Sequence, residues 1–179
     1  MSNRFKIING HAPYFVTFTI IDWVDIFTRK NYRDLFLEAL NFYIDNRGLI
    51  VYEYVIMSNH IHTILQQPNG QLGNTVRDLK KYTAKGILAA AENEPESRRY
   101  WMMDRFEFCG KQVGQPHQVW VHDSHAVELW SLKFFDQKCL YIQLNPVRAG
   151  LVEKPEDWMY SSAYDRLSHS PKVKLFAAI

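Results

Sequence analysis

Two apolar segments meet at a polar pair of residues in YVIMSNHIHTIL, residues 54–65. Both segments are typical of strands, and only Ser58 and Asn59 separate them, so an antiparallel hairpin is expected. Successive side chains of a strand point to opposite faces of a sheet. We therefore expect His60 and His62 to project from one face, with Ile61 and Ile64 directed the other way.

This histidine pair is a candidate metal site. Each imidazole offers a neutral ring nitrogen at physiological pH, and two of them side by side on a strand form a natural pair of ligands. A His-x-His sequence on a strand also occurs as an ordinary surface or core pair. The metal interpretation therefore depends on a third ligand and a reacting group elsewhere in the chain.

Composition favours one globular domain over residues 1–179, with a packed C-terminal tail from about residue 150. Hydrophobic residues make up 47% of the chain, enough for a core, and a net charge of +2 neither demands nor excludes nucleic acid. Cys109 and Cys139 are too few for a disulfide framework, and we interpret them as buried thiols in a reducing cytoplasm. No segment has the order of a signal peptide or the length of a membrane span, so we expect a cytoplasmic protein without membrane contact.

The remaining segments alternate between strands and helices. Strands are predicted over residues 14–21, 49–57, 60–67 and 118–121, and helices over 31–46, 72–92, 100–108 and 131–145. Asn31 is the expected cap of the first helix, and Pro146 is expected to close the last. This order is typical of an α+β sandwich, in which helices pack on one face of an antiparallel sheet.

The last predicted helix carries two faces of interest. Leu132, Phe135, Cys139 and Ile142 follow the helical period and mark its buried stripe. Tyr141 and Asn145 are four residues apart and share a different face. If that face meets the histidines, the amide oxygen of Asn145 is a plausible third metal ligand. Ligation by nitrogen and oxygen without a thiolate suits Mg²⁺ or Mn²⁺, although imidazole pairs also bind Zn²⁺ or Ni²⁺.

A tyrosine beside a bound cation has a specific use. The phenol has a pKa of about 10, and a nearby cation lowers it and polarises a phosphoryl oxygen. Attack by Tyr141 on a phosphodiester would form a covalent phosphotyrosine that keeps the energy of the bond. The cut strand could then be rejoined.

Several basic residues have two open interpretations. One group is either an ordinary solvated helix face or a set of phosphate contacts, and it consists of Arg77, Lys80, Lys81 and Lys85. Arg148 either contacts a DNA backbone or pairs with an acidic residue. A second metal site from His117, His122 and His125 fits no ligand spacing that we recognise.

At this point the chain resembles a known family. Residues 54–62, YVIMSNHIH, are similar to the histidine-hydrophobic-histidine segment of single-tyrosine HUH transposases. Residues 141–152, YIQLNPVRAGLV, resemble the tyrosine-bearing helix of the branch associated with repetitive extragenic palindromes (REP). Residues 14–18, residues 79–83 and the region of Trp120 also fit that branch, so the resemblance covers residues 10–165.

The resemblance implies a ferredoxin-like domain that cleaves single-stranded DNA. It implies a divalent metal held by His60, His62 and Asn145, with Tyr141 as the nucleophile that forms a 5′-phosphotyrosine. The implied substrates are DNA hairpins with a short flanking recognition sequence. A monomer and a homodimer both remain open, because relatives that exchange their catalytic helices are dimers whereas the REP-associated branch looks monomeric.

Two other functions compete with a strand transferase. The chain could be a catalytically silent hairpin-binding protein, although such a relic has no reason to keep two histidines, a tyrosine and an asparagine together. A histidine-triad hydrolase needs a third histidine where Ile64 stands, and a metallo-β-lactamase-like hydrolase needs an aspartate shortly after His62. Neither residue is present.

Overall fold

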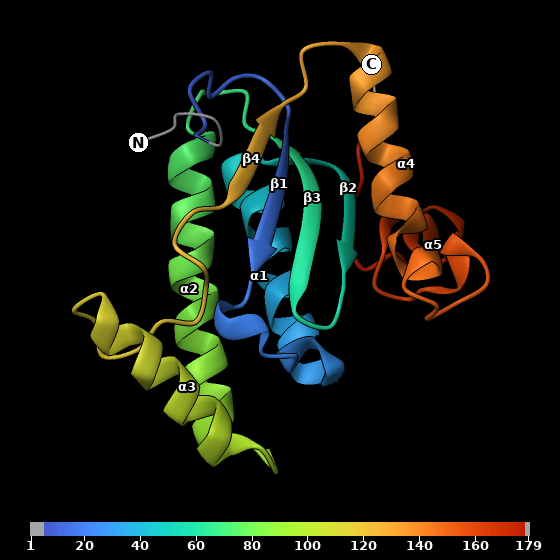
Figure 1. The fold of residues 1–179 in the computed structure, drawn as a ribbon. Helices are drawn as coiled ribbons and strands as arrows, with labels where there is room; N and C mark the ends of the chain where they lie inside the picture. The colour runs from blue at the N-terminus through green and yellow to red at the C-terminus, as the bar shows by residue number, and fades with distance from the viewer. Residues whose placement is uncertain (1–5, 178–179) are drawn as a thin grey trace.

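The computed structural model describes residues 6–177, and four of its strands form one antiparallel sheet (Figure 1). The strands are β1 (Tyr14–Thr19), β2 (Ile50–Ile56), β3 (His60–Gln66) and β4 (His125–Glu128), in the spatial order β2-β3-β1-β4. The order places β3 between β1 and β2, as in a ferredoxin-like domain. The predicted α+β class and the hairpin at Ser58 and Asn59 are confirmed.

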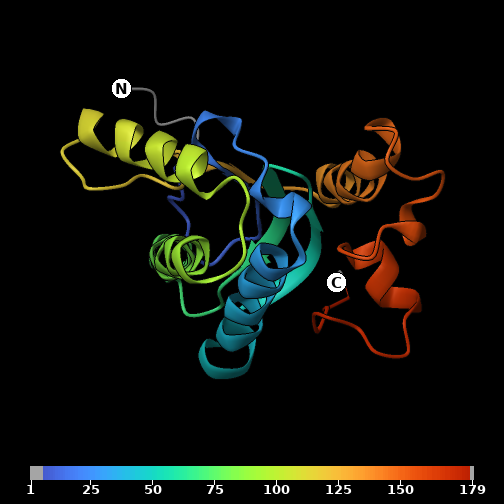
Figure 2. The same ribbon diagram turned by 90° about the horizontal axis from the view of Figure 1, so that it is seen from below.

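Helices lie on both sides of this sheet. α1 (Lys30–Arg47) and α2 (Leu72–Asn93) pack together on one face, and α3 (Arg99–Gln112) extends from the end of α2. α4 (Leu132–Arg148) and α5 (Ser162–Leu167) lie on the side away from α2 (Figure 2). Short 3-10 helices span Ile21–Trp23, Ile26–Thr28 and Pro155–Asp157. The predicted packing of helices on one face of the sheet therefore holds for α1 and α2. It did not include α4, which covers part of the other face.

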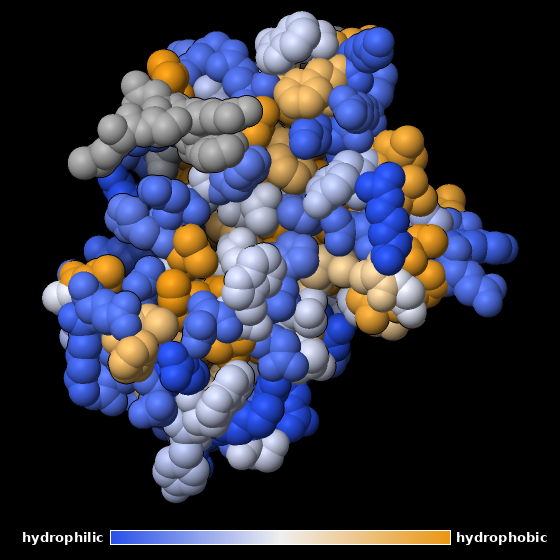
Figure 3. Space-filling model, in the orientation of Figure 1, coloured by the Kyte–Doolittle hydropathy of each residue, from blue (hydrophilic) through white to orange (hydrophobic). Residues whose placement is uncertain are grey.

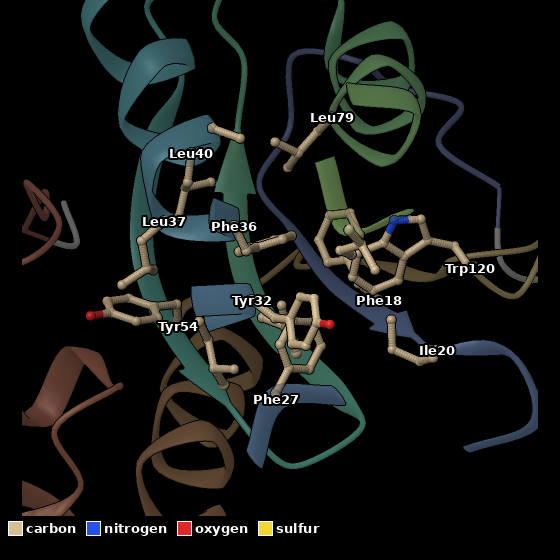
Figure 4. Close-up of a cluster of buried hydrophobic side chains, with 14 of the residues drawn as sticks. Phe18, Ile20, Phe27, Tyr32, Phe36, Leu37, Leu40, Tyr54, Leu79 and Trp120 are labelled. Atoms are coloured by element: carbon tan, nitrogen blue, oxygen red, sulfur yellow. The ribbon is translucent and has the colours of Figure 1, made fainter. Parts of the chain in front are cut away.

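The main core fills the space between the sheet and the α1–α2 pair (Figure 4). Phe18 of β1 and Phe36 of α1 both make edge-to-face contacts with Trp120, at centroid distances of 6.0 and 6.1 Å. Aromatic pairs in this geometry add to the stabilisation that comes from burial. The hairpin contributes the fully buried Tyr54 and Ile61 to the same core.

A smaller core lies between the opposite face and α4. It joins Phe15 and Ile64 of the sheet to Phe135 and Ile142 of α4. The expectation that Ile64 points away from the histidines is wrong, because Ile64 is two residues after His62 and a strand has a period of two. This second core holds α4 against the face that carries His60 and His62.

The boundaries of two helices differ from the predictions. α1 begins at Lys30 after Arg29, without a side-chain cap, so Asn31 is not its N-cap. α4 continues through Pro146 to Arg148. A proline inside a helix removes one backbone hydrogen bond, and here the buried ring of Pro146 offsets that loss. Leu132 is 61% exposed because it is the first residue of α4, so the buried stripe starts at Phe135.

The predicted strand over residues 118–121 is wrong. Trp120 makes a single bridge to Ile20, and the ladder next to β1 is formed by β4 instead. The indole of Trp120 is buried and its Nε1 donates to Thr83 Oγ1 at 3.1 Å. This residue therefore turns into the core rather than continuing along the sheet edge.

The segment after α4 returns to β2. Tyr54 Oη donates to the buried carboxylate of Asp165 in α5 at 2.6 Å, and the backbone N–H groups of Lys172 and Val173 donate to the same carboxylate. Buried polar groups are stable when they are paired in this way. The C-terminal segment is thus attached to β2, the first strand of the hairpin that carries the histidines.

The surface seen in Figure 3 is mostly hydrophilic, with hydrophobic residues in scattered spots. The larger exposed aromatic side chains include three on α3, namely Tyr100, Trp101 and Phe108. Within residues 6–177, no helix has the length and apolar character needed to cross a membrane.

Candidate active site

The histidine pair lies on β3, on the face opposite α1 and α2. The ring centroids of His60 and His62 are 4.7 Å apart and the rings are inclined at 67°. Ile61 between them is fully buried in the main core. The two imidazoles therefore share one face, as the period of a strand predicts.

The Nδ1 atom of each ring is held by a neighbouring side chain. His60 Nδ1 lies 2.8 Å from Asn59 Oδ1, and because an amide oxygen only accepts, Nδ1 donates and Nε2 keeps its lone pair. His62 Nδ1 lies 3.0 Å from the hydroxyl of Thr17 on the neighbouring strand. Such partners orient metal-ligating histidines. The chemistry of the pair therefore fits metal binding through two Nε2 atoms.

Burial keeps both imidazoles neutral. It lowers the pKa of His62 to about 3, with smaller contributions from the charges of His60, Lys138 and His125. Burial also lowers the pKa of His60. A histidine whose pKa is lowered is uncharged at neutral pH and can offer its lone pair to a cation.

α4 brings Tyr141 to this pair. Ser131 caps the helix by accepting a hydrogen bond from the Phe134 N–H, and Phe135 and Ile142 bury its inner side. The Tyr141 hydroxyl then lies 3.4 Å from His62 Nε2, and its ring packs edge-on against Phe15 at a centroid distance of 5.8 Å. A candidate nucleophile is thus placed beside the nitrogen atoms that could hold a cation.

Asn145 lies one helical turn beyond Tyr141 and is half-buried. In the part of the chain that the structure describes, its side chain has no hydrogen bond to either histidine. The same residues contain no group of three or more His, Cys, Asp or Glu side chains arranged to hold a metal ion. Asparagine is not one of these four residue types. Asn145 is therefore the candidate for a third ligand beside the two histidines.

A buried carboxylate that the sequence analysis did not single out holds α4 in place. A bulge between Val51 and Glu53 interrupts the alternation of β2, and the Glu53 side chain reaches α4. Gln143 Nε2 donates to Glu53 at 2.9 Å, Arg166 pairs with it at 2.8 Å, and Ser162 Oγ donates to it. Gln143 is two residues from Tyr141. The one signal in the sequence was a glutamate inside an otherwise apolar strand.

His125 also belongs to the histidine face. It is the register partner of Thr17 on β1, and Thr17 in turn is the partner of His62 on β3. Its charge contributes to the lowered pKa of His62. The sequence analysis set His125 aside because linear spacing does not show that these strands are neighbours.

The predicted DNA-contacting residues separate into two groups. Arg148 lies near the site, with its guanidinium 5.7 Å from the centre of the Tyr141 ring. Arg77, Lys81 and Lys85 are exposed on α2, which packs on the other face of the sheet. Arg77 also pairs with Asp78 at 2.9 Å.

Lys80 has a structural role that the sequence did not reveal. Its ammonium donates to the carbonyl oxygens of Val121 and His122 at 2.7 and 2.8 Å, and to Ser124 Oγ at 3.3 Å. Burial lowers its pKa to about 8. Lys80 therefore anchors the segment before β4 to α2, and a phosphate contact by Lys80 stays a prediction.

Comparisons with known proteins agree with this architecture. The chain is similar in fold to a solved REP-associated tyrosine transposase bound to a REP hairpin, with a TM-score of 0.63 and 16% sequence identity. That similarity covers 100% of this chain and 94% of the other. No curated protein matches the chain.

The family model described as IS200-like transposase matches residues 12–117. This range is more than half of the chain and contains β1, the hairpin with His60 and His62, and α2. Tyr141 and Asn145 lie beyond it, so their roles depend on the geometry of α4. On the evidence of the matched residues, the chain belongs to the IS200-like transposase family.

Proposed function

We propose that the protein is a metal-dependent endonuclease and strand transferase that cuts single-stranded DNA near hairpins through Tyr141. The observation that carries the proposal is the distance of 3.4 Å between the Tyr141 hydroxyl and His62 Nε2. A reacting group and a candidate cation ligand are therefore neighbours, although they come from α4 and β3.

The proposed step is an exchange of one phosphodiester bond for another. The Tyr141 oxygen forms a bond to phosphorus while the bond from phosphorus to the 3′ oxygen breaks. The phenol loses one proton and the departing 3′ hydroxyl gains one, so the overall proton count is unchanged. The product is a 5′-phosphotyrosine on one fragment and a free 3′ hydroxyl on the other, and the reverse reaction rejoins a strand.

The residues that would hold the metal are His60, His62 and Asn145, and the ion that we propose is Mg²⁺ or Mn²⁺. When bound, such an ion neutralises charge on the phosphoryl group and lowers the pKa of a nearby hydroxyl. The held Nδ1 atoms of His60 and His62 support this assignment, because they leave both Nε2 atoms for ligation. Phe15 packs against the rings of His62 and Tyr141 and helps to exclude water there.

The proposed substrate is hairpin DNA with single-stranded flanks, and the similar solved structure is bound to a REP hairpin. Of the five predicted DNA-contacting residues, Arg148 lies beside Tyr141 and is the one best placed to contact the DNA backbone near the cut. Arg77, Lys81 and Lys85 would contact DNA only on the α2 side, at a distance from the reacting groups. Because its DNA substrate is found there, we propose a cytoplasmic location.

The decisive experiment uses hairpin oligonucleotides with single-stranded flanks, labelled at either the 5′ or the 3′ end. With Mg²⁺ or Mn²⁺, a protein-linked product that carries the 3′ label and not the 5′ label is expected, because the 5′ phosphate remains on tyrosine. The Tyr141→Phe variant should bind the same DNA and form no linked product. Hairpin binding without linkage by the unmodified protein would instead support the silent binder, and linkage by Tyr141→Phe would disprove the nucleophile assignment.

A further inference from the structure

A lysine on α4 faces the candidate site without an acidic partner. Lys138 lies three residues before Tyr141 and is half-buried. Its Nζ is 4.6 Å from the centroid of the Phe15 ring and 5.5 Å from that of the Tyr141 ring. A third ring, that of Phe134, is 5.5 Å away. The ammonium group is therefore held over aromatic faces beside the nucleophile.

The ammonium group of Lys138 lies among the rings of Phe15, Phe134 and Tyr141. Among the ion pairs of residues 6–177, none includes Lys138. Ring faces attract a cation but carry no net charge. The charge also reaches His62, where it helps to lower the pKa of the imidazole. A half-buried cation beside an attacking hydroxyl creates a local field that favours an anion.

We propose that Lys138 is a further catalytic residue, which binds a non-bridging oxygen of the phosphodiester that Tyr141 attacks. This assignment rests on the proposed function of Tyr141. Lys138 keeps its proton and forms no covalent bond. It stabilises the negative charge on the non-bridging oxygens while the tyrosine oxygen bonds to phosphorus and the 3′ oxygen leaves.

The placement of Lys138 on α4 favours this role over simple packing. One helical turn separates it from Tyr141, so the two side chains are neighbours on the same side of α4. Its ammonium group lies over Phe15, which also stacks on His62 at a centroid distance of 5.3 Å. Phe15 therefore fixes the lysine, the tyrosine and the histidine relative to one another. Arg148 also lies near the Tyr141 ring, so two cations of α4 are close to the nucleophile.

Three variants separate charge from packing. Lys138→Met keeps an unbranched apolar stem over Phe15 and removes the charge, whereas Lys138→Arg keeps the charge. Lys133→Met is the matched control, because Lys133 lies on the same helix and is exposed. We measure the single-turnover rate of protein–DNA linkage at saturating DNA and metal. DNA affinity is measured separately in the Tyr141→Phe background.

The expected result is that Lys138→Met slows linkage by about 10²–10³-fold, the effect of removing one donor from a charged transition state. Lys138→Arg should recover most of that rate, and Lys133→Met should change it by no more than about twofold. A methylphosphonate at the cut site replaces one non-bridging oxygen with a methyl group, so the linkage carries no negative charge. With that substrate, the difference between the unmodified protein and Lys138→Met should largely disappear.

Four results would overturn the proposal for Lys138. The first is a normal linkage rate in Lys138→Met, and the second is a linkage rate in Lys138→Arg that is as low as in Lys138→Met. The third is a Lys138→Met defect that persists on the methylphosphonate substrate. The fourth is a change in DNA affinity without a change in the linkage rate. Absence of linkage from the unmodified protein is a different result, because it would reject the proposed function itself.

Discussion

The hydroxyl of Tyr141 lies 3.4 Å from Nε2 of His62, although 79 residues separate them in the sequence. α4 lies on the face of the sheet that the α1–α2 pair leaves open, and its own chain supplies the histidines. The candidate site is therefore assembled from β1, β3 and α4 of one molecule. The five predictions below test the parts of this arrangement.

The first prediction concerns the metal. His60→Ala and His62→Ala should each weaken Mn²⁺ binding by more than about tenfold, since each removes a proposed ligand, and should abolish stimulation of DNA linkage by metal. Titration calorimetry with Mn²⁺ measures the affinity. His169→Ala is the control, because His169 is exposed in the C-terminal segment. Full activity in excess chelator would disprove the metal assignment.

Thr17 provides a test of how His62 is oriented. Thr17→Val removes the hydroxyl that meets His62 Nδ1 at 3.0 Å and keeps the volume of the side chain. We expect metal affinity to fall by about 10–100-fold, as for other outer partners of histidine ligands. Thr17→Ser keeps a hydroxyl and should stay close to the unmodified protein. Equal affinities of the valine and serine variants would show that the hydrogen bond is unimportant.

Glu53 connects the stability of the domain to the position of α4. Glu53→Ala leaves Gln143 without its acceptor and should lower the free energy of unfolding by about 1–3 kcal/mol. Gln143→Leu removes only the link to α4, and should slow DNA linkage because Tyr141 is carried by that helix. Urea unfolding and single-turnover kinetics measure the two effects. Glu38→Ala, an exposed site on α1, is the control, and a Glu53→Ala variant as stable as this control would contradict the prediction.

The folding stability of the metal-free protein should depend on acid through His62. Its pKa is about 3 in the folded protein and 6.5 for an ordinary histidine, so the unfolded chain binds more protons between these two limits. The stabilising contribution of neutral His62 is then complete above pH 6.5 and is lost as the pH falls towards 3. The titratable groups that face His62 are His60, Lys138, Tyr141 and His125. The two histidines and Lys138 add positive charge when they are protonated.

Unfolding of the chelated protein at a series of pH values measures this dependence. The His62→Gln variant should show a smaller loss of stability across the same interval, because its amide does not titrate. A loss of the same size in both proteins would assign the acid sensitivity to other groups.

The composition of the site also predicts how subunits behave when mixed. Because Tyr141 and His62 meet within one chain, an equimolar mixture of Tyr141→Phe and a His60→Ala, His62→Ala double variant should form no DNA linkage. Each molecule lacks one part of its own site. Recovery of linkage in the mixture would show instead that molecules exchange α4 and work as a homodimer.

Local pattern was enough to predict the hairpin and the helical face of Tyr141. The period of two placed His60 and His62 together, and the four-residue spacing paired Tyr141 with Asn145 on α4. The class of the fold followed from the alternation of strands and helices. These features depend on neighbours in the sequence, which is why the sequence could predict them.

Contacts between distant segments were not predictable in the same way. The Glu53 carboxylate is satisfied by Gln143, Ser162 and Arg166, all about a hundred residues away. The position of Lys80 in the helical pattern suggests a solvent-exposed lysine. Only the path of residues 121–124 shows that its ammonium group is hydrogen-bonded within the protein. Pro146 stays helical because its ring is buried in the tertiary structure, which a local rule does not include.

The hydrogen bonds that join the two imidazoles to Asn59 and Thr17 have a practical consequence. The turn of the hairpin holds one ring and the neighbouring strand holds the other, so both orientations exist before any ion arrives. The proposed cation would then bind to a site that is already folded and would not be required for folding. A preparation stripped with chelator should keep its shape and regain full competence when the ion is returned.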